Sequence, residues 1–323
     1  MYKTILRRFL IMIPQLFVIT LVMFILASQM PGDALTGLLD PNMPLHVIEQ
    51  MREDMGLNLP WYEQYTLWIA GMFQGDFGMS TTHRRPVEEV IGERIWNTFF
   101  LGIFSLTITY LIAMPLGVLA GKYDRTALDK AIAIYIFMAL AMPTIVLGIV
   151  LIFLFSPIGT GWFPLGGTVS AIVLSSGTPF EIFMSRLHHM ALPAITGALV
   201  STIGIIFMLR ANIVDKKASD YVSLARSKGV PDRVIFGKHI LRNSLIPVAS
   251  NIGLVIAFTF TGTVFVEMIF NFPGIGRLFL DSISLRDFPV VNVLVLFFAF
   301  LTAVGVLLSD IILTIVDPRI RIR

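Results

Sequence analysis

The chain has 323 residues, 56% hydrophobic and only 14% charged, with a mean hydropathy of +0.82. Too little polar surface remains to cover a soluble core of this size, which excludes a soluble globular enzyme. The absence of cysteine excludes disulfide scaffolds, thiolate nucleophiles and cysteine-ligated metal sites, and a net charge of +3 gives no reason to expect a nucleic-acid partner.

Six stretches between consecutive charged residues are long enough to cross a bilayer, because a spanning helix needs about 20 apolar residues. In chain order they lie between Arg8 and Asp33, Arg94 and Lys122, Lys130 and Glu181, Arg186 and Arg210, Arg242 and Glu267, and Asp287 and Asp310. The third stretch is too long for one span, and its Gly- and Pro-rich second half is interpreted as a loop. Pro115 and Pro143 are expected to kink spans 2 and 3. The sequence therefore predicts an all-α polytopic membrane protein with six transmembrane helices.

The basic residues are distributed unequally over the two faces that six spans define. Seventeen of the 24 Lys and Arg fall at the two termini, between spans 2 and 3, or between spans 4 and 5. The positive-inside rule makes this face cytoplasmic and places both termini there. A seven-span alternative, in which residues 156–180 also cross, would export the basic loop 210–243, and the same rule disfavours it.

The spans divide the chain into three parts. Residues 1–30 form the cytoplasmic N-terminus and span 1, residues 31–95 an external cap, and residues 96–323 the core with spans 2–6. The cap contains two expected amphipathic helices, after Pro44 and Pro60, which either rest on the membrane rim or contact a substrate. In the core, residues 271–288 are expected to form an external turn and a short amphipathic helix.

The cytoplasmic loop 210–243 is long enough to fold into a helix-turn-helix elbow. Asp220, Tyr221, Leu224, Ala225 and Lys228 have helical spacing. After this helix, Gly229 is a suitable residue for the left-handed position that ends it, and Pro231 for the start of the next one. The small side chain of Ala225 would let another surface approach closely.

No catalytic motif is found in the sequence. The nearest approach to a phosphate-binding loop, Gly117 to Lys122, has the wrong spacing, and Gly117 and Gly121 are interpreted as a helix-packing pair. His188 and His189 are adjacent and would point to different faces of a helix, so they do not indicate a metal site. No cofactor or metal is expected on the chain itself.

The stretch from Asp220 to Gly229 resembles the cytoplasmic signature loop of ABC importer permeases, above all those of the oligopeptide and dipeptide (peptide/nickel) branch. Of the Glu-Ala-Ala triplet of the wider superfamily, only the last alanine is present, as Ala225. Shorter similarities extend the resemblance over nearly the whole chain: His239, Leu241-Arg242-Asn243, Leu245 and Pro247, Pro31-Gly32-Asp33, Gly75-Asp76-Phe77-Gly78, Pro273-Gly274-Ile275-Gly276 and Asp317-Pro318-Arg319.

The resemblance implies a non-catalytic, channel-forming permease subunit in the cytoplasmic membrane of a prokaryote, importing oligopeptides or dipeptides. It implies a second homologous permease, one or two cytoplasmic ATPase subunits that hold ATP and Mg, an extracytoplasmic peptide-binding protein and contact with membrane lipid. Residues expected to couple to the ATPase are Asp220, Tyr221, Leu224, Ala225, Arg226, Lys228, Gly229 and Val230. Glu267, near the outer end of span 5, and Pro273 with Gly274 are candidate contacts with the substrate or the partner permease.

Two other functions stay open at this point. The same scaffold could import nickel or another small solute, because the signature loop concerns the ATPase and not the cargo. A secondary transporter driven by an ion gradient would be expected to show inverted repeats and ionisable residues at the midplane, and the sequence shows neither.

Overall fold

The computed structural model describes residues 2–29, 44–54 and 56–316, and their regular structure is helical apart from one isolated bridge between Met79 and Pro86. The elements are α1 (Tyr2–Gln29), α2 (Leu45–Asp54), α3 (Trp61–Gln74), α4 (Val87–Lys122), α5 (Ala127–Ala141), α6 (Thr144–Phe155), α7 (Ala171–Ser176), α8 (Pro179–Lys217), α9 (Asp220–Ser227), α10 (Asp232–Val234), the π-helix η1 (Ile235–Leu241), α11 (Arg242–Ser244), α12 (Ile246–Ser250), α13 (Ile252–Ile269), α14 (Ile275–Ser284) and α15 (Phe288–Val316).

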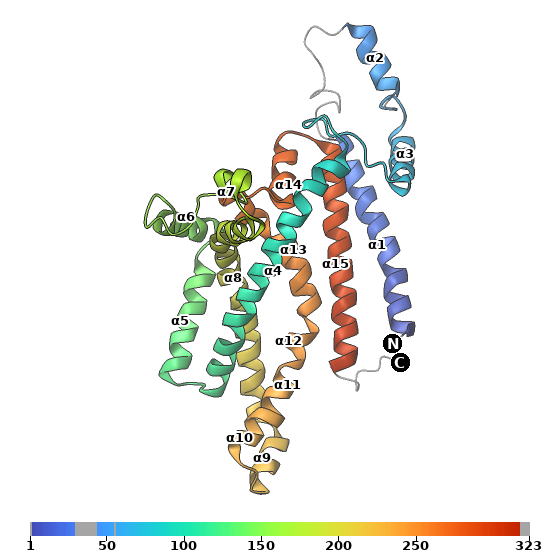
Figure 1. Cartoon of the computed structure of the whole chain (residues 1–323). Helices are drawn as coiled ribbons and strands as arrows, with labels where there is room; N and C mark the ends of the chain where they lie inside the picture. Colours follow the sequence, from blue (N-terminus) through green and yellow to red (C-terminus); the bar gives the residue numbers. More distant parts are fainter. Residues whose placement is uncertain (1, 30–43, 55, 317–323) are drawn as a thin grey trace.

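Five of these helices, α1, α4, α8, α13 and α15, are long and apolar enough to cross a membrane. Helices α5 and α6 pass the same test only as a pair, and they are bent by 103° at the break between them. With the bent pair counted as one span, the six-span prediction is confirmed, and the chain is an all-α polytopic membrane protein. Figure 1 shows α9 and α10 at one end of the bundle, the elbow end, and α2 and α3 at the other, the cap end.

The break in the third span is larger than the expected kink, and Pro143 explains it. Proline has no N–H for the helical ladder and forces the preceding residue out of the helical region. Met142 accordingly has extended angles, φ −97° and ψ 115°, and α6 starts afresh at Thr144. The loop predicted after this span is present and contains the single short helix α7.

Helices α4 and α8 pack side by side and form the centre of the bundle (Figure 1). Gly117 and Gly121 face α8, which confirms the predicted packing pair. A Cβ on Gly121 would lie 2.6 Å from the Cβ of Ile213, and one on Gly117 would lie 3.1 Å from the side chain of Leu209. The two backbones can therefore approach only because these positions carry no side chain.

We expect Gly121→Ala to destabilise the chain by about 1–3 kcal/mol, because an added methyl group overpacks a close helix contact. Gly92→Ala is the matched control: Gly92 lies in the same helix and its added Cβ would meet no atom within 4 Å. Thermal inactivation in detergent measures both. Equal midpoints for the two variants would contradict the packing role of Gly121.

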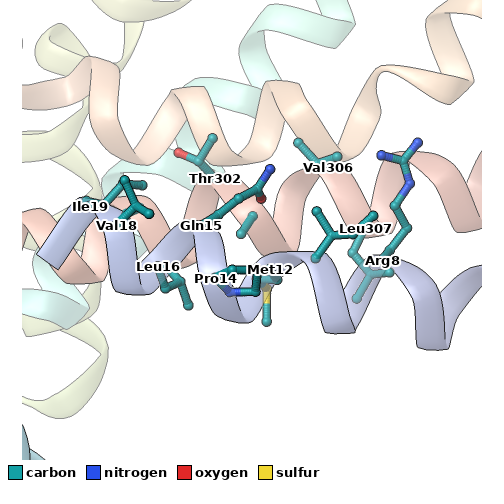
Figure 2. A pocket seen from close by; sticks show the side chains of 13 residues that line it. Arg8, Met12, Pro14, Gln15, Leu16, Val18, Ile19, Thr302, Val306 and Leu307 are labelled. Atoms are coloured by element: carbon teal, nitrogen blue, oxygen red, sulfur yellow. The ribbon is translucent and has the colours of Figure 1, made fainter. Parts of the chain in front are cut away.

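Helix α1 lies at the edge of the bundle, against α15 (Figure 1). Between them is a groove of about 810 Å³, lined mostly by apolar side chains, with Gln15 and Thr302 near its middle (Figure 2). At its elbow end Arg8 Nε lies 2.7 Å from Asp310 Oδ2. Asp310 thus forms an ion pair that ties the start of α1 to the end of α15.

At the cap end, a buried carboxylate fastens the segment before α4 to the segment before α15. Asp287 is fully buried and accepts hydrogen bonds from the Ser80 hydroxyl and from the N–H groups of Thr81 and Thr82. The two segments are more than 200 residues apart in sequence. The start of α4, which falls within the predicted cap at Val87, is therefore held against the C-terminal third of the chain.

Candidate functional site: the helical elbow

The elbow, residues 210–243, has the predicted helix-turn-helix form. Helix α9 ends in two hydrogen bonds, from Gly229 N–H to the Arg226 carbonyl and from Val230 N–H to the Ala225 carbonyl. This pair is the Schellman motif, which needs a left-handed residue after the helix. Gly229 supplies it with φ +73°, so its predicted role as the helix stop is confirmed.

Among the described residues, and leaving out its two chain neighbours, no atom would lie within 4 Å of a Cβ placed on Gly229. The glycine is therefore required by its backbone conformation and not by a close neighbour within the chain. Ala225 is half-buried and packs against the cluster around Val222 and Ile235. Its small side chain allows this close packing within the elbow, and the approach of another surface at Ala225 stays a prediction.

The two faces of α9 have opposite environments. Val222 is fully buried and joins the main core cluster of the elbow end, which also contains Ile213 and Ile235. On the other face, Tyr221 and Leu224, one helical turn apart, are 38% and 57% exposed. Helix α9 is thus packed against the core on one face and exposes two apolar side chains on the other face, at the tip of the molecule.

Charged residues surround this apolar pair. Asp220 lies in the first turn of α9, and Lys228 is exposed at its C-terminal end. Arg226 lies 3.2 Å from Asp232, which bridges α9 to the start of α10 across the turn. Because both groups are well exposed, this pair contributes at most about 1 kcal/mol and mainly restricts the turn.

The base of the elbow is braced by ion pairs that the sequence analysis did not anticipate. Arg210 donates two hydrogen bonds to Asp129, from Nε at 2.6 Å and from Nη2 at 2.8 Å. Lys217 binds Asp124 and also the carbonyl oxygens of Gly121 and Lys122, which end α4. The last turns of α8 are therefore fixed to the connection between α4 and α5.

The second arm of the elbow is a π-helix where an α-helix was expected. After the three residues of α10, η1 continues for seven residues to Leu241. In a π-helix residue i bonds residue i+5, so residues five apart come to lie nearly above one another. Ile235 and Ile240 are spaced in this way and both are buried. The arm continues through α11 and α12 into α13, with small breaks before Ile246 and at Asn251.

Glu267, Pro273 and Gly274 come together at the cap end, where α4, α13 and α14 meet. The Glu267 carboxylate is fully buried and accepts hydrogen bonds from Thr98 Oγ1 at 2.7 Å and from Arg277 N–H at 2.9 Å. It therefore binds the free N–H groups at the start of α14.

The neighbouring residues adapt to this carboxylate. A Cβ on Gly274 would lie 2.4 Å from Glu267 Oε2 and 2.5 Å from Oε1, so only glycine fits beside this buried carboxylate. The carbonyl of Pro273 accepts a hydrogen bond from Asn97 Nδ2 at 2.8 Å. Within the described part of the chain these residues bind one another, and their contact with a substrate or a partner permease stays a prediction.

Two protein-family profiles together match almost the entire chain. Residues 113–322 match the "Binding-protein-dependent transport system inner membrane component", and residues 1–101 match its N-terminal counterpart, "Binding-prot-dependent transport system membrane comp, N-term". The chain is 40% identical over 317 residues to the "Oligopeptide transport system permease protein AppB" of Bacillus subtilis (strain 168), covering 98% of each protein. It is 33% identical over 322 residues to the "Glutathione transport system permease protein GsiC" of Escherichia coli (strain K12), covering 99% of each.

Proposed function

Because this chain belongs to the family of binding-protein-dependent transport system inner membrane components, we propose that it forms the channel of an ATP-driven peptide importer and is driven through its elbow. Membership makes the chain a multi-pass permease subunit of an ABC importer in the inner membrane of a prokaryote. Such a subunit works with an ATPase and a binding protein. The cargo, the coupling site and the partner stoichiometry belong to the proposal.

One observation supports the coupling assignment. Helix α9 exposes two apolar side chains on one face, while its opposite face is packed against the core. Tyr221 and Leu224 are available to a partner, while Val222 anchors α9 in the core. Exposed apolar side chains ringed by charges are typical of a protein-binding surface. A partner that docks on this tip gains a firm attachment to the helices behind it.

The connections of the elbow indicate how the movement spreads. Helix α9 follows α8 directly, and η1 leads through α11 and α12 into α13. A displacement of the tip is therefore passed to two spans that also contact each other and α4. Closure of an ATPase pair beneath the elbow would tilt α8 and α13 as levers, which is the rigid-body movement that alternating access needs.

The assignment requires the elbow to lie in the cytoplasm, and the absence of cysteine makes this easy to test. Ser227 is exposed at the end of α9, so a Ser227→Cys chain carries a single accessible thiol. We expect a membrane-impermeant thiol reagent to leave it unmodified in sealed cells and to modify it after permeabilisation. Modification in sealed cells would contradict the topology and the ATPase contact together.

The peptide cargo is supported by the relatives, since both named cargoes, oligopeptide and glutathione, are peptides in chemical terms. The proposed assembly contains this chain, a second homologous permease, one or two ATPase subunits and a peptide-binding protein that delivers the cargo. Nickel remains the alternative cargo on the same scaffold. Among the described residues, no three His, Asp or Glu side chains are grouped to hold a metal ion.

Uptake into proteoliposomes tests this function. With all subunits and ATP present we expect labelled tripeptide to accumulate, with no accumulation when the ATPase is omitted and no effect of a proton uncoupler. Accumulation that the uncoupler abolishes would support a secondary transporter. Accumulation of nickel in place of peptide would agree with an ATP-driven importer but would contradict the assignment of peptide as its cargo.

A further inference from the structure

A small cavity with mostly apolar walls and several hydroxyl groups lies in the bundle, between α4, α8, α13 and the start of α6. Its volume is about 300 Å³. It is lined by Leu101, Ser105, Thr144, Pro193, Gly197, Val200, Ser201, Val255, Phe258, Thr259, Thr263 and Val266. Ser105, Gly197 and Thr259 each lie near the middle of their helix. The cavity is therefore close to the centre of the membrane-spanning region.

The cavity combines hydroxyl groups with an absence of charge. Five of its lining residues are Ser or Thr, and the described residues that line it include no Asp, Glu, Lys, Arg or His. Within the described part of the chain, the hydroxyls of Ser105, Thr144 and Ser201 have no hydrogen-bond partner; Ser105 is only 4% exposed, Thr144 is half-buried and Ser201 is exposed. For Ser105, a nearly buried hydroxyl group without a partner is costly, so this group indicates a polar occupant of the cavity.

The broken third span adds unpaired N–H groups at the same place. Thr144 is the first residue of α6, and Pro143 before it provides no side-chain cap. The first N–H groups of a helix have no partner within the helix. In membrane transporters, interrupted helices commonly provide such groups to a bound substrate. Thr144, at this helix start, therefore lies beside the other hydroxyl-bearing residues of the cavity.

We propose that this cavity binds the backbone amide groups of the transported peptide. The inference rests on the proposed function and adds the substrate contact. Hydroxyls donate and accept, so they match a peptide C=O and N–H equally well. A site without charge holds the uncharged interior of a peptide and not its charged ends. Because such a site would bind the peptide backbone, it would not select for particular side chains. This property suits a protein that transports peptides of varied sequence.

The cavity is closely packed on one side, where α8 approaches Ser105, and is open to the surface at Ser201 and Phe258. A Cβ on Gly197 would lie 3.0 Å from Ser105 Oγ, so this glycine lets α8 lie close to the serine. At the mouth, Ser201 is exposed and Phe258 is 61% exposed. Peptide could therefore enter between α8 and α13, the two helices that the elbow is proposed to tilt.

Thiol protection tests the inference in the complete importer, reconstituted with its ATPase and binding protein. A Ser201→Cys chain should react with a small water-soluble thiol reagent. Tri-alanine at a saturating concentration should slow the reaction about threefold or more, because an occupied cavity protects the thiol. Thr302→Cys, in the groove beside α1 (Figure 2), is the matched mid-span control and should react at a rate that tri-alanine does not change.

A kinetic measurement complements the labelling. Ser105→Ala and Ser201→Ala should each raise the KM for tri-alanine uptake about fivefold, the usual effect of one lost hydrogen bond, whereas Thr302→Val should leave it unchanged. If the Ser201→Cys chain does not assemble into the importer, the KM for tri-alanine uptake by the Ser105→Ala chain tests the inference by itself. Peptide uptake without protection and with unchanged KM would overturn this inference only. Failure of the unmodified importer to take up peptide would overturn the proposed function and the inference with it.

Discussion

Replacing Gly229 by valine is expected to abolish ATP-driven uptake while the permease still inserts and assembles. Gly229 has φ +73°, and a side chain in this left-handed region costs about 1–2 kcal/mol, more for a β-branched residue. The substitution opens the Schellman motif that closes α9 and so turns Tyr221 and Leu224 away from their present direction. Because a Cβ added at Gly229 would meet no atom of the described residues beyond its chain neighbours within 4 Å, the bundle itself should be unaffected.

Gly161 provides the control for this experiment. It also has φ +73°, a Cβ placed on it would likewise meet no atom within 4 Å, and it lies in the loop after α6, far from the elbow. Gly161→Val therefore imposes the same backbone strain at a place with no proposed coupling role. We expect Gly161→Val to retain most uptake and Gly229→Asn to retain part of it, because Asn tolerates this conformation better than valine. Similar losses in Gly161→Val and Gly229→Val would show a general effect of strain and contradict the coupling role.

The sequence was sufficient to predict the features that depend on local composition. The charge-free windows identified the spans because hydrocarbon excludes charged groups over about 20 residues. Gly229 and Gly121 could be assigned because a helix stop and a close helix contact each demand the smallest residue. The two cap helices begin as expected after Pro44 and Pro60.

Contacts between residues that are far apart in the chain could not be predicted from the sequence. Glu267 was predicted to contact a substrate or partner. A carboxylate near a membrane span costs free energy unless it binds another group. Its partners within the chain, Thr98 and the N-terminus of α14, became identifiable only when the helices were placed, and the predicted external contact stays untested. The Asp129–Arg210 pair was missed for the same reason, although two opposite charges at neighbouring span ends were a usable signal.

The third span shows a different limit. Pro143 was recognised, but a proline inside a span produces anything from a slight kink to a complete break, according to what the neighbouring helices allow. Here Gly148 lets α6 lie against α13: a Cβ at this position would be 3.1 Å from Ile269. The size of the bend therefore depends on a contact more than 100 residues away, and that contact also places Thr144 at the cavity.

The second large effect is expected at the tip of the elbow. Leu224→Asp should remove the ATPase from the importer and abolish ATP-driven uptake. An apolar side chain that a partner buries contributes about 1.5–3 kcal/mol, and a carboxylate in its place adds a desolvation cost. Because Leu224 is 57% exposed, the substitution should not disturb the fold of the free permease.

Leu285 allows a matched comparison, since it is 59% exposed but lies at the cap end, after α14. The decisive measurement is the amount of ATPase that copurifies with the tagged permease from the membrane. Leu285→Asp is expected to retain the ATPase at the level of the unmodified chain, and Leu224→Asp to lose nearly all of it. Retention of the ATPase by Leu224→Asp would contradict the claim that the elbow couples this permease to ATP hydrolysis.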